Sequence, residues 1–583
     1  MRHLLASVRP SAAVAFLCVA AALAYGLGAA GPYEQRVLAL AAIYGLNVVG
    51  YQLIFGHAGA LSLAQATFFG LGAYATALLS LAFGWDALLT FPAAILVATA
   101  LGLVVAVPVL RLETHYLALA TLGISQVALL AATNWQSLTG GANGLPGVPG
   151  FAVAGFEIGR GLPMLVLAWG CLALGLLAAA RYLSPRRRLA YELQRERPLA
   201  AAAVGIDRDR LRLVALLMSA AYGGAAGALY VHTTRVISPD ALAFSILVLT
   251  LAMTVIGGRL SLAGAVLGAL LLTHVPEWFR VLDRWYLLAY GAAMLAMIVF
   301  APNGLAALID GLAAPLSRRA GRLALPALPP VPAEAEVPPP PPSPAPAEGV
   351  ALSLDGLRKS FGGVVAVDIR ALAVPAGQVC GIIGPNGSGK TTLLNLVSGF
   401  ETPDRGAIAA FGTRLDRLPA FRRAGAGIAR CFQHPMLLDG RSVLDNVATA
   451  ARGRDAAAVR AAALDAIGRC GLDAVADRPC RSLSFGQRRL VELARALAAG
   501  PRLVLLDEPA AGLADADRDR LAAVIAGSPG VTWLVVDHNT AFLAAIASRL
   551  VCLDAGTVIA DGTPEAVLAD PAVRRAYFGM AAR

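Results

Sequence analysis

Long apolar runs fill the first half of the chain, with few polar positions between them. A helix needs about 20 mostly apolar residues to cross a membrane. The pattern predicts about ten such helices, near residues 11–30, 36–55, 61–83, 86–110, 116–133, 162–183, 211–231, 241–257, 262–275 and 286–301. We therefore expect a multi-pass, all-helical membrane region. The first run is long for a signal peptide, and we expect it to remain as an uncleaved anchor.

A different pattern follows residue 350, where short apolar runs alternate with helix-forming stretches. Three of these runs are Val379–Ile383, Leu503–Leu506 and Val531–Val536. Short apolar runs separated by helices are typical of buried parallel strands joined by crossover helices. The second half is therefore predicted to be an α/β domain.

Proline and alanine separate the two halves between Leu325 and Glu348, with an unbroken proline run at 338–342. This composition favours a polyproline II tether, which at ~3.1 Å per residue reaches roughly 70 Å when fully extended. A tether of that reach does not dictate where the second half docks. The predicted organisation is a membrane domain at residues 1–320, a linker at 321–349 and an α/β domain at 350–583.

The chain has a formal net charge of +11, although only 15% of its residues are charged. The basic residues stand singly or in short clusters beside apolar runs, which indicates membrane orientation and not a nucleic-acid partner. By the positive-inside rule, these clusters remain in the cytoplasm. They are Arg2 and Arg9, then Arg181, Arg186, Arg187 and Arg188, then Arg318, Arg319 and Arg322. An even number of spans then places the α/β domain on the cytoplasmic side of the cytoplasmic (inner) membrane.

The seven cysteines have no CxxC spacing and do not cluster with histidine. This arrangement argues against a zinc site and against a disulfide framework. We expect reduced thiols that pack as small apolar side chains.

A glycine-rich loop follows the first predicted strand and reads Gly384-Pro385-Asn386-Gly387-Ser388-Gly389-Lys390-Thr391-Thr392. Glycines let successive backbone N–H groups turn toward phosphates, and the helix that begins there adds the positive end of its dipole. In this pattern Lys390 supplies charge for the β- and γ-phosphates, and the Thr391 hydroxyl ligates Mg²⁺. A plain glycine-rich turn is the alternative. The position between an apolar strand and a helix favours an ATP site.

Two carboxylates, Asp507 and Glu508, end the run Leu503–Leu506. At a strand end beside the phosphate loop, Asp507 can hold the Mg²⁺ shell while Glu508 polarises the attacking water. Alone, the pair would be a solvated cap, and His538 after the next strand would be an ordinary core or surface histidine. Their order and spacing together predict an ATP hydrolase.

The segment Leu483-Ser484-Phe485-Gly486-Gln487, with the loop and acidic pair, resembles the ATP-binding-cassette (ABC) ATPases over residues 350–583. The resemblance implies a P-loop ATPase with a helical subdomain and assigns hydrolysis to Glu508, the switch histidine His538 and the Q-loop residue Gln433. It implies Mg²⁺ binding by Thr391, Gln433 and Asp507, adenine stacking on Phe361, and contacts of Ser484 and Gly486 across a dimer. The implied nucleotide-binding residues are Phe361, Gly384, Asn386, Gly387, Ser388, Gly389, Lys390, Thr391, Thr392, Ser484, Gly486 and Gln487.

One position departs from the ABC pattern. After Ala511-Gly512-Leu513, where many members have an aspartate, this chain has Ala514. Communication between cassettes through that contact is therefore in doubt, although neighbouring Asp515 could replace it. Because Ser484 would contact nucleotide in an opposing cassette, a second ATPase is an implied partner.

A polar stretch, Arg195–Asp207, lies between the sixth and seventh predicted spans. A short amphipathic helix ending at Gly205 could fit a cleft of the ATPase and transmit its movement, and an ordinary inter-helix loop is the alternative. The stretch resembles the coupling loop of importer permeases.

The membrane half as a whole is similar to the permeases of leucine-isoleucine-valine (branched-chain amino acid) importers. The stretches that carry this resemblance are Asn47 with 56–59, then 116–123, 139–144, 197–206 and 256–258, and those of the matching ATPases are 361–363, 510–513 and 575–579. The resemblance implies a fusion of one polytopic all-α permease with one ATPase. Its implied partners are membrane lipid, a second permease, a second ATPase and a periplasmic solute-binding protein.

Polar residues within the spans are candidates for the solute path because an unpaired amide in lipid is costly. They are Asn47, Gln52, Gln65 and Gln126, and helix-to-helix hydrogen bonding explains them equally well. Residues 139–144 are expected to face the periplasm and either contact the binding protein or form a plain turn. Related systems take urea, short amides or other amino acids, and the sequence does not discriminate among them. An exporter would need several long polar loops, and an ATP-dependent sensor would need an additional domain.

Overall fold

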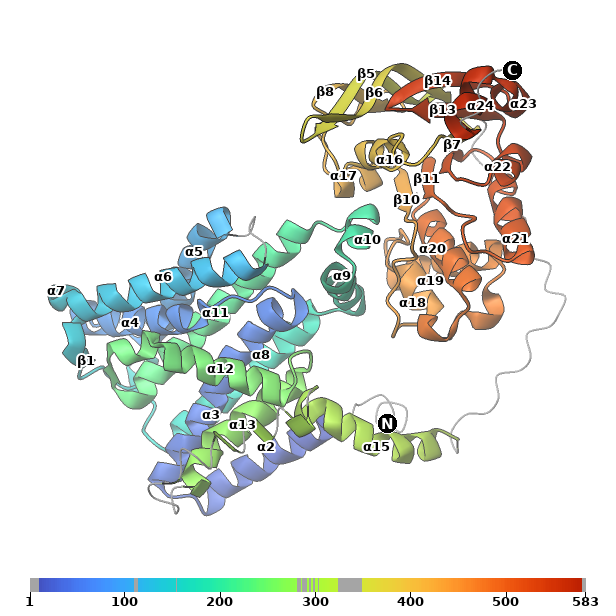
Figure 1. The fold of residues 1–583 in the computed structure, drawn as a ribbon. Coiled ribbons are helices and arrows are strands. Elements are labelled where there is room, and N and C mark those ends of the chain that lie inside the picture. The colour runs from blue at the N-terminus through green and yellow to red at the C-terminus, as the bar shows by residue number, and fades with distance from the viewer. Residues whose placement is uncertain are drawn as a thin grey trace. The chain divides into compact units, whose positions relative to one another are not determined.

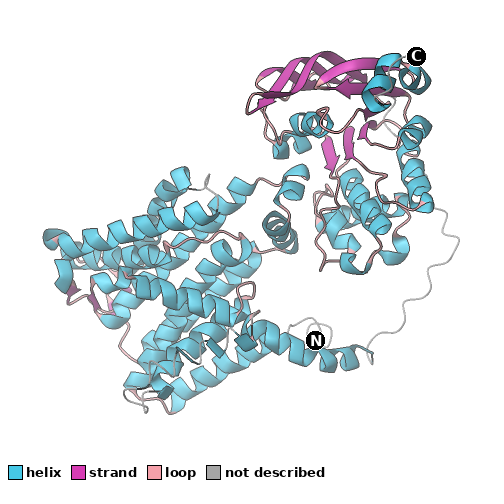
Figure 2. Ribbon diagram, in the orientation of Figure 1, coloured by secondary structure: helices cyan, strands magenta, loops and turns pink. Residues whose placement is uncertain are grey.

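The structure, a computed structural model, describes residues 10–109, 114–153, 155–279, 285, 291, 292, 295, 296, 299–301, 303–322 and 349–578. The chain divides into two compact units. The helical unit comprises Met1–Tyr191 and Asp209–Pro330, and the α/β unit comprises Glu192–Arg208 and Val331–Arg583. Strands are concentrated in the α/β unit (Figure 2). The predicted fold class, a polytopic helical region followed by an α/β ATPase fold, is confirmed.

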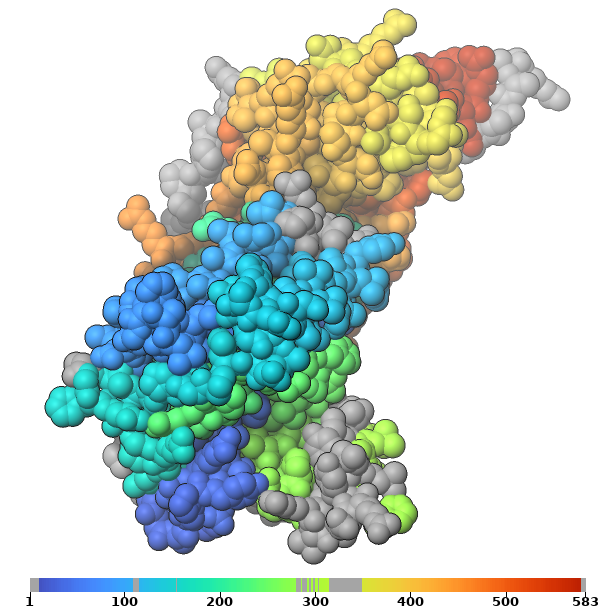
Figure 3. Space-filling view, turned by 90° about the vertical axis from the view of Figure 1, so that its left-hand side faces the viewer, coloured from blue at the N-terminus to red at the C-terminus, as the bar shows by residue number. Residues whose placement is uncertain are grey.

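Seven helices among the described residues are long and apolar enough to span a membrane. They are α2 (Pro10–Gly28), α3 (Pro32–Tyr51) continued by the π-helix Gln52–His57, α4 (Gln65–Phe83), α5 (Ala87–Val109), α6 (Thr114–Asn134), α8 (Leu162–Tyr182) and α11 (Arg208–Thr234). These seven match the first seven predicted spans. The outer faces of α5 and α6 are largely exposed, and they contribute blue and cyan surface in Figure 3.

The eighth, ninth and tenth predicted spans agree less closely with the structure. The eighth and ninth are present as the shorter helices α12 (Phe244–Gly257) and α13 (Leu262–Phe279). The tenth, 286–301, lies mostly outside the described residues, as do Arg2 and Arg9 and most of the predicted linker. The apolar pattern did not predict α15 (Gly304–Arg322), whose last turns are basic.

Helix α3 lies at the centre of the helical unit, with 83% of its apolar window buried, and it packs against α8 and α13. Glycines set the closest approaches between helices. A Cβ on Gly72 of α4 would lie 2.3 Å from the Gly224 oxygen of α11, and a Cβ on Gly227 would lie 1.9 Å from the Phe69 oxygen. These two helices can therefore touch backbone to backbone only because the small residues are there.

A six-stranded sheet forms the core of the α/β unit, in the order β10-β11-β12-β7-β13-β14. The strands are β7 (Val379–Ile383), β10 (Ile428–Cys431), β11 (Leu503–Asp507), β12 (Thr532–Val536), β13 (Arg549–Asp554) and β14 (Thr557–Gly562). Only the β13–β14 pair is antiparallel. The three predicted buried strands thus lie side by side, β11 beside β12 and β12 beside β7, in parallel register.

A second, antiparallel sheet has the order β6-β5-β8-β9 and comprises β5 (Val350–Phe361), β6 (Val364–Pro375), β8 (Arg405–Ala410) and β9 (Thr413–Arg414). One apolar core joins both sheets to α16 (Lys390–Ser398). The helical subdomain contains α18 (Val443–Ala448), α19 (Ala456–Arg469) and α20 (Phe485–Ala498), which pack on one another (Figure 1). The parallel strands end at the loops that carry the predicted site residues.

Candidate nucleotide site and its coupling segment

The phosphate loop connects β7 to α16, and its glycines are required by space and by backbone conformation. Gly384 and Gly389 have φ values of +152° and +98°. A Cβ on Gly384 would lie 2.2 Å from the Leu553 oxygen, and one on Gly389 would lie 2.1 Å from the Ala366 oxygen. Any side chain at either position would fill or distort the loop. The loop is therefore shaped to bring backbone groups against a bound phosphate chain.

Lys390, the first residue of α16, turns back across this loop. Its Nζ atom donates to the carbonyls of Gly384 and Pro385 at 2.7 and 2.8 Å. Burial lowers the pKa of Lys390, while Glu508 and Asp507 oppose that shift. Ser388 is buried in the same loop, and its hydroxyl oxygen has no hydrogen-bond partner among the described residues. The loop thus offers a cation and an unpaired hydroxyl to phosphate oxygens.

Asp507 ends β11 and is held by an arginine. Its Oδ2 atom accepts from Nη2 of Arg430 at 3.1 Å, and both side chains are buried. The Nη1 atom of Arg430 also donates to Asn395 and Ser398 of α16, at 2.6 and 2.7 Å. Burial raises the pKa of Asp507, while Arg430 opposes that shift. One carboxylate oxygen is thereby fixed, and the other is left for a different partner.

Two predicted residues, Gln433 and His538, contact Glu508, which was also predicted. Its Oε2 atom accepts from Nε2 of Gln433 at 2.7 Å, and its Oε1 atom lies 2.7 Å from Nε2 of His538. Glu508 has φ +47°, a left-handed conformation that is rare for a non-glycine residue and that clusters at functional sites. The backbone N–H of Glu508 donates to Val536 at 2.7 Å, which stabilises this turn. The structure therefore gathers Gln433, Glu508 and His538 at the ends of neighbouring strands.

The signature residues lie at the start of α20. The Ser484 hydroxyl accepts from the Gln487 N–H at 3.2 Å, and the Gln487 side chain accepts from the Ser484 N–H at 3.1 Å. This reciprocal capping box begins the helix. A Cβ on Gly486 would collide with Asp517 at 1.9 Å. The described hydrogen bonds connect this cap to its own helix, and none joins it to the phosphate loop.

The remaining predicted nucleotide residues are placed on accessible positions. Phe361 ends β5, is 45% exposed, and has the Lys359 ammonium 5.1 Å from its ring centre. Asn386 and Thr391 are exposed, and Thr392 is half-buried in the first turn of α16. An exposed aromatic ring at a strand end is available for stacking.

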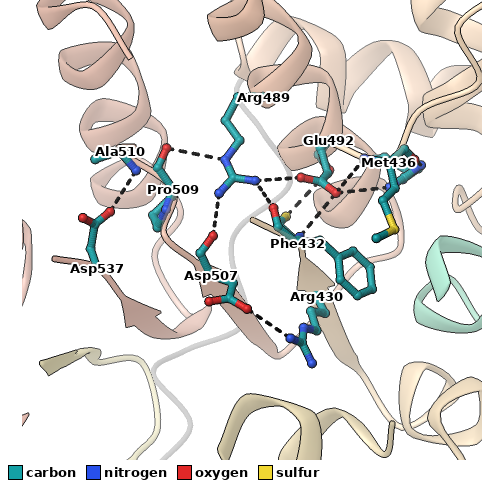
Figure 4. A network of polar contacts seen from close by, with 11 residues as sticks. Arg430, Phe432, Met436, Arg489, Glu492, Asp507, Pro509, Ala510 and Asp537 are labelled. Carbon is teal, nitrogen blue, oxygen red and sulfur yellow. Dashed lines mark hydrogen bonds and ion pairs between the residues drawn. The ribbon is translucent and has the colours of Figure 1, made fainter. Parts of the chain in front are cut away.

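The structure contains a buried network of charged residues that was not predicted from the sequence (Figure 4). Glu492 of α20 is 1% exposed and accepts from the backbone N–H groups of Phe432 and Met436 at 3.3 and 3.4 Å. Arg489 pairs with Glu492 at 2.9 Å and donates to the Asp507 carbonyl at 2.7 Å. The signature helix thus holds the backbone on both sides of the Gln433–Glu508 contact. Charged residues at three-residue spacing within the apolar run of α20 were the signal that could have revealed it.

Ala514, which stands where many ABC ATPases have an aspartate, lies at the start of a helix. Ala514 is the N-cap of α21 (Asp515–Ala526) and offers no side-chain cap. Asp515 is exposed, and its Oδ1 atom accepts from Arg518 at 2.6 Å. Asp515 therefore has a local partner within its own helix.

The predicted coupling segment belongs to the α/β unit. Helix α10 (Pro198–Ala203) packs on α17 (Ala420–Gly425), and Gly205, with φ +87°, ends the stretch beside it. Glu192 accepts a bidentate pair from Arg441, with Nε at 3.0 Å and Nη2 at 2.6 Å. The contact surface is thus formed within this one chain.

A second charged contact leads from this segment to the signature helix. Arg197 donates to Asp439 at 3.3 Å, and the other oxygen of Asp439 accepts from Arg488 at 2.6 Å. Arg488 is one residue from Gln487 and lies in α20. The segment is therefore linked by side chains to the helix that carries the signature residues.

In the helical unit, the polar candidates for a solute path bond to other helices. Asn47 of α3 donates to Thr250 of α12 at 3.0 Å and accepts from Gln65 of α4 at 2.7 Å. Gln65 accepts in turn from Ser219 of α11 at 2.6 Å. All four side chains are buried. For Asn47 and Gln65 the arrangement favours helix-to-helix bonding over a place in the solute path.

The other two candidates for the solute path, Gln52 and Gln126, have different surroundings. Gln52 lies in the π-helix and donates to the carbonyls of Gly258 and Ser261 at 3.1 and 2.9 Å. Gln126 is exposed on α6. Within residues 139–144, Thr139 is buried and its hydroxyl donates to Ala132 at 2.6 Å, which makes part of that stretch a structured turn.

Comparison with known proteins matches separate parts of the chain to different families. Residues 35–301 match the family described as branched-chain amino acid transport system / permease component. Residues 368–511 match the ABC transporter family, and residues 557–579 match the family described as branched-chain amino acid ATP-binding cassette transporter.

Individual relatives match the second half. The high-affinity branched-chain amino acid transport ATP-binding protein BraF of Pseudomonas aeruginosa is 34% identical over 253 residues, which is 40% of this chain and 98% of BraF. LivG of Escherichia coli, with the same description, is 34% identical over 252 residues, again 40% and 98% of the two chains. A solved ADP-bound cassette of an ABC transporter is 29% identical, covers 40% of this chain and 100% of its own, and has a TM-score of 0.37.

The fold and the site together define an ABC transporter, a multi-pass membrane protein that binds ATP and couples its hydrolysis to transport. The chain belongs to the branched-chain amino acid ABC transporter family and carries its permease and its ATPase in one polypeptide.

Proposed function

We propose that this chain is one permease and one ATPase of a complex that imports branched-chain amino acids across the cytoplasmic membrane. The observation that carries the proposal is the convergence of Gln433, Glu508 and His538 in the same unit as residues 192–208. That segment is continuous in sequence with the spanning helices α8 and α11. Hydrolysis and the membrane region are thus connected through one short stretch of chain.

Mg²⁺ suits the residues around this convergence. The Thr391 hydroxyl, the Gln433 amide oxygen and the free oxygen of Asp507 are all oxygen donors, which Mg²⁺ prefers. No cluster of three or more His, Cys, Asp or Glu side chains suited to a metal occurs in the part of the chain that the structure describes. This agrees with an ion held by one carboxylate, phosphate oxygens and water. Bound there, Mg²⁺ would supply charge neutralisation on the β- and γ-phosphates.

The side chains have separate roles in hydrolysis. Glu508 orients the attacking water and accepts its proton, since Gln433 and His538 already fix the position of its carboxylate. Because Gln433 donates through Nε2, its Oε1 atom remains available to the metal. Lys390 stabilises negative charge on the phosphate chain, and Phe361 stacks on the base.

Partners follow from the positions of Ser484 and Gly486. Ser484 caps α20 and Gly486 lies in its first turn, and we infer that they complete the nucleotide site of a second ATPase. The family membership supports a second permease and a periplasmic binding protein as further subunits, with the α/β unit in the cytoplasm and the membrane lipid around the helical unit. The names of BraF and LivG support branched-chain amino acids as the solute.

Uptake in reconstituted vesicles tests the proposal. We expect radiolabelled leucine to accumulate only with ATP, the binding protein and all subunits, and isoleucine and valine to compete. ATP hydrolysis that is indifferent to solute, with no label entering, would refute import. Uptake of urea, a short amide or another amino acid without uptake of leucine would refute the cargo alone.

A further inference from the structure

A cavity of about 400 Å³ opens in the helical unit where α3 and α8 begin and α11 ends. All of its lining residues belong to this unit. This volume is within the range of small-ligand sites. Among the described residues, the lining includes three arginines and neither aspartate nor glutamate. The cavity is therefore suited to an anion.

The three arginines of the lining are engaged to different degrees. Arg36 and Arg160 are exposed, and neither has an ion-pair partner among the residues that the structure describes. Arg235 pairs with Glu157 at 2.5 Å through Nη2, and its Nε atom has no hydrogen-bond partner in the described part of the chain. Two positive charges thus remain uncompensated at the cavity.

The start of α8 adds backbone donors to the same cavity. Its N-cap is Gly161, with φ +79°, and no side chain caps this 21-residue helix. The N–H groups of its first turn and the positive end of its dipole therefore remain available to an anion. The start of α3 differs, because Glu34 accepts there from the Gly31 N–H at 2.5 Å.

A buried histidine places a hydrogen-bond acceptor beside these donors. His232 lines the cavity from α11 and is only 4% exposed. Its Nδ1 atom is 3.0 Å from the Pro149 carbonyl oxygen, which can only accept, so Nδ1 carries the proton and Nε2 is an acceptor in the neutral ring. Nε2 has no hydrogen-bond partner among the described residues. Because Arg235 lines the same wall, a neutral hydroxyl suits this acceptor and a positively charged donor does not.

The cavity lies at the ends of membrane-spanning helices. Helices α3, α8 and α11 are each long and apolar enough to cross a membrane, so their ends lie at the level of the lipid headgroups. The end of α2 is beside the cavity, since Gln35 of the lining donates to the Gly26 carbonyl at 3.1 Å. Tyr25 and Tyr33 are exposed on these helix ends, and tyrosines are enriched at the membrane–water interface.

We propose that this cavity binds an anionic phosphodiester that carries free hydroxyl groups, the chemistry of a phosphatidylglycerol headgroup. The phosphate faces Arg36, Arg160 and the start of α8, and a headgroup hydroxyl donates to Nε2 of His232. Ile158 and Met164 of the lining provide apolar contacts for the glycerol carbons. Zwitterionic headgroups fit less well, because no carboxylate of the lining would receive their cationic group. The proposal does not depend on which solute the chain transports.

Native mass spectrometry of the purified full chain tests the headgroup chemistry, because it resolves individual lipid-binding events. The probes are phosphatidylglycerol, phosphatidylethanol, which has the same charge and no headgroup hydroxyl, and zwitterionic phosphatidylcholine. We expect phosphatidylglycerol to bind about three- to tenfold more tightly than phosphatidylethanol, which lacks one hydrogen bond, and at least about tenfold more tightly than phosphatidylcholine. Equal binding of phosphatidylethanol would overturn the hydroxyl contact, and equal binding of all three lipids would overturn the site.

Variants then locate the binding. Arg36→Gln with Arg160→Gln should weaken phosphatidylglycerol binding about tenfold or more. His232→Asn, which keeps a donor near the position of Nδ1 and removes the free acceptor, should abolish the preference over phosphatidylethanol. Arg181→Gln with Arg259→Gln is the matched control, because both are exposed arginines of the helical unit outside this cavity. Unchanged phosphatidylglycerol binding in the paired cavity variant would refute the site.

Two further measurements separate a lipid from other anions. Glycerophosphoglycerol is the same headgroup without acyl chains, and we expect it to bind weakly to the chain in phosphatidylcholine nanodiscs. If it binds as tightly as the lipid, a soluble phosphodiester is the ligand and the lipid assignment fails. If the paired arginine variant keeps its affinity for phosphatidylglycerol but loses affinity for a solute-binding protein, the cavity receives an acidic protein side chain and the proposal fails.

Discussion

Hydrogen-bonded polar side chains have different consequences in the two units. At the ends of β10, β11 and β12, the Glu508 carboxylate is held by Gln433 and His538, yet the Gln433 amide oxygen has no hydrogen-bond partner among the residues that the structure describes. In the helical unit, Asn47 and Gln65 are held by each other and by neighbouring helices. Polar burial in the helical unit therefore stabilises the packing of helices.

The largest effect tests the catalytic side of this contrast. Glu508→Gln keeps the shape of the side chain but removes the proton acceptor, so hydrolysis at this site should fall by roughly 10²- to 10⁴-fold. Nucleotide affinity should change little, because Lys390 and the phosphate loop are intact. Phosphate release and binding of a fluorescent ATP analogue by the assembled complex are the two measurements.

The control for this variant is Asp465→Asn, which alters an exposed carboxylate of α19 outside the predicted site. The second ATPase must carry its own inactivating substitution so that it contributes no turnover. Under those conditions, full hydrolysis by Glu508→Gln would contradict the assignment of Glu508.

The helical side of the contrast predicts a loss of stability and not of solute affinity. Asn47→Leu removes one buried hydrogen bond from Thr250 and one from Gln65, which should cost about 1–3 kcal/mol. Melting of the full chain in nanodiscs should shift downward, while leucine affinity remains. Gln126→Leu, on an exposed face, should leave the melting temperature unchanged. A tenfold loss of affinity at unchanged stability in Asn47→Leu would place Asn47 in the solute path.

The difference between the two units also explains which features could be predicted from the sequence. The phosphate loop, Asp507 and Glu508 are short linear motifs whose local backbone determines their geometry, and the structure brings Gln433 and His538 to Glu508 as the ABC resemblance implied. The first seven spans follow from apolar length alone.

Features that depend on distant segments were not predictable. The cavity that Arg36, Arg160 and Arg235 line is formed by the starts of α3 and α8 and the end of α11, which are far apart in sequence, and no local pattern marks their meeting. The Arg489–Glu492 network depends on which face of α20 is buried against the Gln433 loop. The predicted span 241–257 ends at Gly257, as α12 does, but it begins three residues too early, because Pro239–Leu242 forms a separate 3-10 helix.

A charge reversal tests whether residues 192–208 couple the two units. Glu192→Arg places like charges where Arg441 now forms a bidentate pair, and it should reduce solute-stimulated hydrolysis severalfold without changing basal hydrolysis. Adding Arg441→Glu should restore most of the stimulation. Asp465→Arg, the same change of charge on an exposed position of α19, is the matched control. Failure of the double variant to recover would indicate that shape and not charge determines this contact.

The smallest expected effect concerns the end of the chain. The Tyr577 hydroxyl accepts from the Gly384 N–H at 3.0 Å, so α24 (Pro571–Phe578) helps position the phosphate loop. Tyr577→Phe removes this acceptor while keeping the ring, which should cost about 0.5–1.5 kcal/mol. Because the loop binds nucleotide before reaction, the loss should raise the KM for ATP a few fold and leave kcat nearly unchanged. Phe578→Tyr, which adds a hydroxyl at the adjacent position, is the control. A fall in kcat at unchanged KM would mean that Tyr577 acts on the chemical step and not on loop position.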